Sequence, residues 1–214
     1  QLGAQCAAVT TEFENVPAHS LSALVEHTFV APGADCVSIA QDRLAEKNFF
    51  TQCAQVSGVL PAPHQRISTE ADIDTLSESL FPGILKTARL GYDGKGQSVL
   101  RSDLDLKSSW QKLSGTSLIL EGFVPFQREL SVIAVRSQTG NIVVYPLVQN
   151  YHRDGILRLS LAPAPGLHLP LQSEEINIVA KVMNALSYVG VLTIEMFDTD
   201  GGLILNEMAP RVHN

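Results

Sequence analysis

The sequence predicts an α/β fold. Strand-like and helix-like segments alternate along most of the 214 residues, a pattern typical of layered α/β proteins. Hydrophobic residues make up 45% of the chain and charged residues 17%, which is ordinary for a globular protein with a sizeable core. No apolar run approaches the roughly 20 residues that are needed to cross a bilayer. We therefore expect a layered globular fold with no membrane segment.

Net charge and cysteine usage narrow the class of function. The formal net charge of −7 argues against a general nucleic-acid surface. Cys6, Cys36 and Cys53 lack metal-ligand spacing, and an odd number of cysteines does not indicate a disulfide framework. We expect them to be small buried side chains of a cytoplasmic protein. Because the chain starts at Gln1 without a methionine and ends directly after a polar motif, we expect a piece of a longer enzyme.

The first third of the chain predicts a short strand and two helices. The strand covers 9–13, and a helix covers 17–27 with Pro17 suited to its first turn. A second helix is expected from about 41 to 56, before a glycine and two prolines. The proline-rich stretch 60–63 indicates a boundary between units.

The middle of the chain predicts a compact unit around a glycine-rich loop. A helix over about 69–80 begins with Thr69 and Asp72 at the spacing of a capping box. After it we expect two strands, a short helix and a third strand, over 83–86, 97–101, 106–113 and 117–121.

The last part of the chain is rich in strands. We expect strands over 129–136, 141–149 and 156–161, and a helix over about 173–187. The apolar stripe of that helix is predicted to be Ile176, Val179, Ala180 and Met183. A hairpin follows, with arms over 191–197 and 203–207 around a polar, glycine-containing turn.

The glycine-rich loop is the first chemical signal. Lys86 ends a strand, and Gly91, Gly94 and Gly96 follow with charged residues between them. Glycine lets backbone amides approach a ligand closely, and consecutive amides can form an anion-binding concavity. An ordinary hairpin with solvated charges would have a similar sequence. The glycine spacing is neither that of a Walker P-loop nor that of a Rossmann fingerprint.

Two acids in the hairpin are the second signal. If the turn is centred near Gly201, Glu195 lies opposite Glu207, where like charges destabilise a sheet. Such a pair can share a proton, flank a basic side chain or hold a cation, and Mg²⁺ completed by phosphate oxygens suits it. A one-residue slip in register would instead turn one glutamate to water. Together with Lys86 and its loop, the pair predicts a nucleoside triphosphate site.

Four motifs resemble the 5-(carboxyamino)imidazole ribonucleotide synthetase family, the ATP-grasp enzymes of bacterial and fungal purine synthesis. The motifs stand in family order and the resemblance covers essentially the whole chain. They are Thr11-Glu12-Phe13-Glu14-Asn15-Val16-Pro17, the segment 86–97, the segment 152–158 and the segment 206–214.

The resemblance implies an α/β ATP-grasp fold truncated at both ends. Residues 1–66 would be the remainder of an N-terminal α/β domain, 67–128 a lid subdomain and 129–214 a core subdomain. ATP would lie between the last two. The family is commonly dimeric, so a homodimer is implied as well.

The implied reaction is carboxylation of aminoimidazole ribonucleotide by bicarbonate, driven by ATP with Mg²⁺. ATP phosphorylates bicarbonate to carboxyphosphate, and the exocyclic amine captures that intermediate or carbon dioxide released from it. The alternatives are a formate-using ribonucleotide transformylase, a nucleotide-binding module without turnover and a purely structural domain.

The resemblance also implies roles for individual residues, although Arg43, Glu129, His152 and Glu12 taken alone could equally be solvated side chains. Arg43 and Lys86 would hold the phosphates of ATP, and Glu129 would hold its ribose, with His152 and Asn206 nearby. The lid over ATP would consist of Gly91, Tyr92, Asp93, Gly94, Lys95, Gly96 and Gln97. The hinge at adenine would consist of Glu121, Gly122, Phe123 and Val124. Mg²⁺ would be held by Glu195 and Glu207. The catalytic candidates are Arg211 and His213 beside bicarbonate together with Lys95 and Asp93, and the aminoimidazole substrate would meet Glu12, Tyr92, Asp93, Lys95 and Arg211.

The residues that follow Glu207 differ from the pattern of the wider ATP-grasp family, and this difference distinguishes between its branches. Many ATP-grasp enzymes end the last strand with Glu-x-Asn-Pro-Arg, whereas here Met208 and Ala209 follow Glu207. This branch of the family shares that feature. The departure therefore favours it over biotin carboxylase and peptide-ligase relatives.

Overall fold

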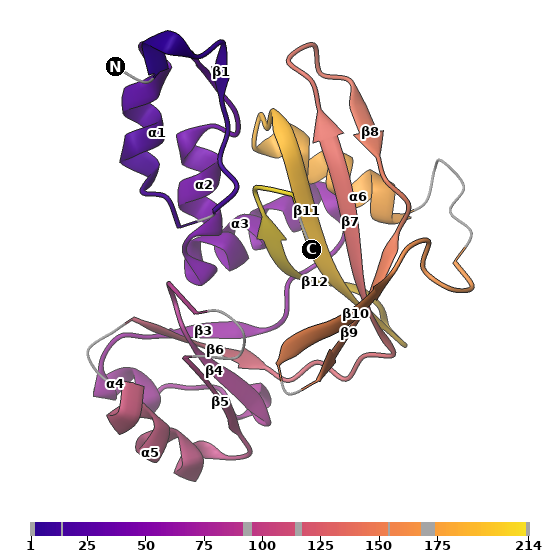
Figure 1. The fold of residues 1–214 in the computed structure, drawn as a ribbon. Coiled ribbons are helices and arrows are strands. Elements are labelled where there is room, and N and C mark those ends of the chain that lie inside the picture. The colour runs from indigo at the N-terminus through magenta and orange to yellow at the C-terminus, as the bar shows by residue number, and fades with distance from the viewer. Residues whose placement is uncertain are drawn as a thin grey trace.

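The computed structural model contains two larger sheets with helices packed against them, and a small sheet of two short strands near the N-terminus (Figure 1). It describes residues 3–13, 15–91, 96–113, 117–153, 155–167 and 174–212, without the side chains of 103, 104 and 107. The helix α3 lies between the other N-terminal elements and the two larger sheets (Figure 1). The α/β class expected from the sequence is therefore confirmed.

The N-terminal part is built mainly of helices. Its elements are the 3₁₀ turn η1 (Gly3–Gln5), β1 (Ala8–Val9), α1 (Ala18–Val25), β2 (Phe29–Val30), α2 (Ala34–Ala40) and α3 (Arg43–Ser57). The two short strands pair in parallel. The predicted strand over 9–13 is wrong beyond Val9, because the Thr11 hydroxyl donates to the carbonyl of Phe13 and closes a local turn.

Helix α3 has the ends that its sequence favours. The Asp42 carboxylate accepts hydrogen bonds from the backbone N–H of Leu44 and Ala45, both at 3.1 Å. Gly58 closes the helix with φ 79°, a conformation that suits glycine. The prediction of this helix is confirmed, whereas α2 was not predicted.

The smaller sheet is antiparallel, with order β3-β6-β4-β5. Its elements are β3 (His64–Ile67), α4 (Glu70–Ile73), η2 (Glu78–Leu80), β4 (Gly83–Thr87), β5 (Gln97–Leu100), α5 (Asp103–Leu113) and β6 (Leu118–Gly122). The capping prediction is confirmed, since the Asp72 carboxylate accepts from the Thr69 N–H at 2.8 Å. The single helix predicted over 69–80 is wrong, because the Ser77 hydroxyl caps a new 3₁₀ turn instead.

The larger sheet has order β10-β9-β7-β11-β12, and β8 pairs with β7. Its elements are β7 (Arg128–Arg136), β8 (Ile142–Val144), β9 (Val148–Arg153), β10 (Ile156–Leu161), α6 (Glu174–Ala185), β11 (Gly190–Thr199) and β12 (Gly202–Ala209). The strand predicted over 141–149 divides into β8 and β9, because Pro146 between them has no N–H for a ladder.

Helix α6 and α3 supply the apolar side chains that cover the larger sheet. The buried stripe of α6 is Ile178, Val179, Val182 and Met183, so the predicted Ile176 and Ala180 are corrected to half-buried positions beside it. Phe50 of α3 is fully buried in the same hydrophobic cluster. Of the three cysteines that were all predicted to be buried, Cys36 and Cys53 are buried, whereas Cys6 is only half-buried. No helix in the described ranges is long and apolar enough to cross a membrane.

Candidate functional site

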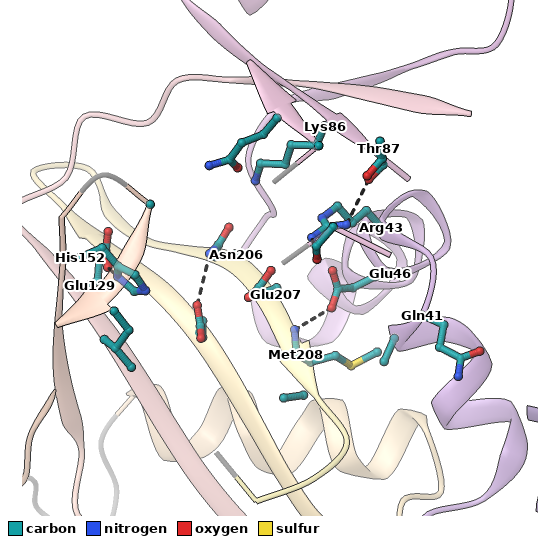
Figure 2. A pocket seen from close by; sticks show the side chains of 18 of the residues that line it. Gln41, Arg43, Glu46, Lys86, Thr87, Glu129, His152, Asn206, Glu207 and Met208 are labelled. Carbon is teal, nitrogen blue, oxygen red and sulfur yellow. Dashed lines mark hydrogen bonds and ion pairs between the residues drawn. The ribbon is translucent and has the colours of Figure 1, made fainter. Parts of the chain in front are cut away.

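A cavity of about 350 Å³ lies between the two sheets, next to the first turn of α3 (Figure 2). Strand β4 contributes Lys86 to it, and strands β7, β9, β11 and β12 contribute acidic, amide and imidazole side chains. Arg43 and Glu46 reach it from α3. Charged groups from three separate parts of the chain therefore meet in one place.

A β-bulge places the acids of the hairpin. Thr199 pairs with Gly202, so the turn is tighter than expected, and this register alone would set Glu195 opposite Asn206. The register shifts between Ile194 and Met196, so that both Asn206 and Glu207 oppose Glu195. The expected facing of the two glutamates is present, reached through a bulge instead of a turn centred on Gly201.

The acid pair has the electrostatics of a cation site. The charge of Glu195 raises the pKa of the Glu207 carboxyl, and burial raises it further. Asn206 Nδ2 lies 3.5 Å from Glu195 Oε2. No three His, Cys, Asp or Glu side chains in the described part of the chain form a metal cluster. The two carboxylates fit Mg²⁺ if phosphate oxygens and water complete its shell, the arrangement that Mg²⁺ commonly adopts.

Arg43 ties the start of the loop to α3. Its guanidinium donates to the carbonyls of Thr87 and Gly91, both at 3.0 Å, and its backbone N–H donates to the carbonyl of Ala88 at 2.9 Å. The side chain also lines the cavity (Figure 2). Arg43 is thus more than the solvated helix charge that its sequence position allows, and its contact with phosphates stays a prediction.

Lys86 reaches the cavity while paired with a buried acid. Its Nζ lies 3.0 Å from Glu121 Oε2, and the side chain of Glu121 is 5% exposed. Lys47, itself buried, lies 3.5 Å from the same oxygen. Burial alone would raise the pKa of Glu121, but the two lysines outweigh it and hold the pKa at about 2.

The ionisation of Glu121 makes the stability of the folded protein depend on pH in the acidic range. A carboxyl with a depressed pKa adds stability above its unfolded value, near 4.5, and loses it as the pH falls toward about 2. We expect the melting temperature to fall across this window, and Glu121→Gln to flatten that fall and lower the melting temperature at neutral pH. Thermal melts followed by circular dichroism between pH 2 and 7 measure this. The control is Glu26→Gln at an exposed position, for which the melting temperature should depend on pH as in wild type. The same pH dependence in Glu121→Gln and Glu26→Gln would contradict the assignment.

Glu129 and His152 form a second charged pair in the cavity wall. His152 Nδ1 and Glu129 Oε2 are in contact, and both side chains line the cavity. The hydrogen bond to Glu129 raises the pKa of His152 and outweighs partial burial, and the charges of Glu195 and Glu207 act in the same direction. This environment therefore stabilises the imidazolium form relative to a free histidine side chain.

Of the other residues predicted from the sequence, some line the cavity and some lie outside the described part of the chain. Gly91, Gly96, Gln97, Asn206 and Arg211 also line the cavity. Tyr92, Asp93, Gly94, Lys95 and His213 lie outside the described residues.

Two groups of predicted residues are not brought into the cavity. Its described lining does not include Glu12 or the hinge Glu121, Gly122, Phe123 and Val124. Glu12 is exposed and lies in a bend instead of on a strand face. In the hinge, the N–H groups of Gly122 and Phe123 already donate to the carbonyls of Pro63 and Pro82, both at 2.8 Å. Their role at adenine stays a prediction.

Sequence reasoning missed two buried ionisable side chains beside the site, Glu46 and Lys47. Burial, and then the charge of Glu207, raise the pKa of the Glu46 carboxyl well above its usual value. A signal for them existed, because Arg43, Glu46 and Lys47 stand at i, i+3 and i+4 and share one face of the helix. Charges on that face of a helix are usually solvated, so the pattern alone did not single them out.

Comparisons with known proteins place the chain in a family. An ATP-grasp domain family model matches residues 52–214, and a ribonucleotide synthetase preATP-grasp domain model matches residues 1–41. A Pseudomonas aeruginosa protein named N5-carboxyaminoimidazole ribonucleotide synthase is 44% identical over all of this chain, which covers 58% of that protein. The chain therefore spans little more than half the length of this relative.

Solved structures that are similar to this chain carry the same family name. The N5-carboxyaminoimidazole ribonucleotide synthetase of Thermus thermophilus superposes with a TM-score of 0.84 at 44% identity, over 97% of this chain and 55% of that one. The Staphylococcus aureus N5-carboxyaminoimidazole synthetase complexed with ADP gives a TM-score of 0.89 at 32% identity, over 100% of this chain and 56% of that one.

Proposed function

The chain belongs to the ATP-grasp family and within it resembles N5-carboxyaminoimidazole ribonucleotide synthases, and on this premise we propose that it carries the nucleotide- and metal-binding centre of such an enzyme. The proposed activity is ATP-dependent carboxylation of 5-aminoimidazole ribonucleotide by bicarbonate. One observation carries it: Lys86 and the Glu195/Glu207 pair line the same cavity although they lie on different sheets.

The chemistry explains why such a cavity is needed. Bicarbonate is a poor electrophile, so its oxygen first takes the γ-phosphoryl group of ATP and ADP leaves. The exocyclic nitrogen of the aminoimidazole then bonds to the carboxyl carbon, either of carboxyphosphate or of carbon dioxide released from it. Phosphate departs and the amine loses a proton. Carboxyphosphate reacts readily with water, so a closed site that excludes water is required.

Residues of this chain can supply most of the electrostatics. Lys86 and Arg43 add positive charge where phosphate oxygens would lie, and Glu195 with Glu207 would hold Mg²⁺. When bound, the metal neutralises charge that develops during phosphoryl transfer. We further propose that Arg211 and His213 meet bicarbonate, and that Glu12, Tyr92, Asp93 and Lys95 belong to the aminoimidazole side.

We propose three units for the chain: 1–66 as the remainder of an N-terminal α/β domain, 67–128 as the lid subdomain and 129–214 as the core subdomain. Two hydrophobic clusters support the division of the last two. One, around Leu85 and Leu118, belongs to the smaller sheet, and the other, around Leu130 and Ile194, belongs to the larger sheet.

A cytoplasmic homodimer is part of the proposal. Size-exclusion chromatography with light scattering tests the dimer directly. A monomer at micromolar concentration would remove it without touching the proposed chemistry.

Phosphate release tests the function. The protein is incubated with ATP, Mg²⁺ and bicarbonate, with and without aminoimidazole ribonucleotide, and phosphate is measured over time. We expect release that depends on both bicarbonate and the ribonucleotide. Stimulation by formate instead of bicarbonate would indicate a formate-using transformylase. Nucleotide binding without any phosphate release would indicate a binding module. The absence of an ATP-dependent thermal shift would indicate a purely structural domain.

A further inference from the structure

Two consecutive ionisable residues of α3, Glu46 and Lys47, are buried beside β12, the strand that carries Glu207; we call it the metal-binding strand. Glu46 is 2% exposed and Lys47 is 1% exposed. Side chains of these types are almost never so deeply buried unless a specific partner holds them. Their partners therefore indicate what they do.

Both side chains bind backbone on either side of Glu207. Lys47 Nζ donates to the carbonyl of Asn206, and Glu46 Oε1 accepts from the N–H of Met208 at 2.6 Å. Figure 2 shows Glu46 reaching Met208 with Glu207 next to it. The segment Asn206–Met208 is thus held by two adjacent residues of one helix.

The bulge and the position of β12 at the edge of the sheet together explain why this segment has partners from outside the sheet. A bulge interrupts the ladder and leaves backbone groups of the extra residue unpaired. Strand β12 is also the last strand in the sheet order, so its outer edge has no neighbouring strand in the described part of the chain. One residue earlier, the N–H and carbonyl of Leu205 are satisfied by Leu60 and Ala62. Side chains of α3 replace a strand at the next positions.

Lys47 also connects this segment to the opposite wall of the cavity. Its Nζ lies 3.5 Å from Glu121 Oε2, and Lys86 Nζ lies 3.0 Å from the same oxygen. Glu121 is on β6 and Lys86 on β4, both in the smaller sheet. A continuous series of polar and charged contacts therefore runs from the metal-binding strand to the cavity lysine.

We propose that Lys47, together with Glu46, is a positioning residue that fixes Glu207 relative to Lys86. This inference rests on the proposed function, because it assumes that Glu207 binds the metal of a metal–nucleotide complex. A purely stabilising ion pair would not explain the arrangement, since well-packed apolar side chains often stabilise a core as well as a buried pair does. Apolar side chains could not hold the carbonyl of Asn206.

The test is a Mg²⁺ titration of ADP binding by calorimetry with Lys47→Met, which keeps the bulk of the stem and removes the charge. Loss of a side chain that orients a metal ligand typically costs about 10- to 100-fold in metal affinity. We expect the Mg²⁺ concentration at half-saturation to rise by about tenfold, while ADP binding in EDTA changes less. Lys181→Met, on an exposed position of α6, is the matched control and should titrate like wild type.

A second variant separates positioning from folding. Lys47→Met leaves Glu121 with one lysine partner, so Lys47→Met/Glu121→Gln removes both members of the buried pair. We expect the double variant to keep the near-ultraviolet circular dichroism of wild type and still show the weakened Mg²⁺ dependence. Wild-type Mg²⁺ dependence in a folded variant, or failure of both variants to fold, would overturn the inference. Absence of Mg²⁺-dependent ADP binding in the wild-type protein would instead reject the proposed function.

Discussion

Under the proposed function, replacement of Glu207 by glutamine should reduce aminoimidazole-stimulated ATP hydrolysis by about a hundredfold or more. Glutamine keeps the size of the side chain but removes the negative charge that faces Glu195 in the cavity. A bound divalent cation contributes several kcal/mol to the transition state of phosphoryl transfer, and about 2.7 kcal/mol corresponds to a hundredfold in rate. Loss of one of the two carboxylates that we propose as metal ligands should have an effect of that order.

The same substitution should stabilise the protein when no metal is present. Glu195 raises the pKa of Glu207, which shows that the two charges oppose each other in the folded state. Glutamine removes that repulsion, so the melting temperature in EDTA should rise while activity falls. A stabilised but inactive variant would indicate that the acid pair is kept for function at a cost to stability.

Phosphate release and thermal melts in EDTA, made on the same preparation, measure both effects. Glu174→Gln, at an exposed position in the first turn of α6, is the control and should leave the rate unchanged. Normal activity of Glu207→Gln would remove the metal assignment. A melting temperature below that of wild type in EDTA would contradict the repulsion.

Replacement of Lys86 by alanine should weaken ATP binding by about tenfold to a hundredfold. A hydrogen bond to a charged group is worth about 1.5–3 kcal/mol, and each 1.4 kcal/mol changes the dissociation constant about tenfold. Lys86 is the cavity-facing partner of Glu121, whereas Lys47 is the buried partner. The fold should therefore survive, because Glu121 keeps one cation after the substitution.

Calorimetric titration with ATP and Mg²⁺ measures the change in affinity. Lys112→Ala, on the exposed surface of α5 in the same part of the chain, is the matched control. An unchanged ATP dissociation constant for Lys86→Ala would count against its place at the phosphates. A loss of equal size in Lys112→Ala would point to long-range charge effects instead of a specific contact.

Local patterns predicted many of the secondary-structure elements of the fold. The β4/β5 pair, α3 and the hairpin of β11 and β12 lie close to where capping residues, glycines and apolar alternation indicated. The errors have local physical causes. The expected helix over 69–80 divides into α4 and η2, since the Thr75 hydroxyl donates to the carbonyl of Asp72 and the Ser77 hydroxyl accepts from the N–H of Ser79, and a continuous helix would use these backbone groups.

Motifs identified the acid pair, the loop lysine and the family, because each depends on residue type and spacing along the chain. They also predicted that Glu195 faces Glu207, and the register brings them together. The tertiary structure decided how this is achieved. A bulge of one residue cannot be read from turn composition, because its stabilising contacts come from Lys47 and Glu46, about 160 positions earlier in the chain.

The sequence by itself determined the chemical groups of the site, since charge and hydrogen-bonding capacity belong to each side chain. Only the tertiary structure decided which of these groups share a cavity and which are buried partners. Glu121 illustrates the difference: as a motif residue it predicts a contact with adenine, but in the fold two lysines converge on its carboxylate. Burial and neighbouring charge arise from packing, and no pattern along the chain contains them.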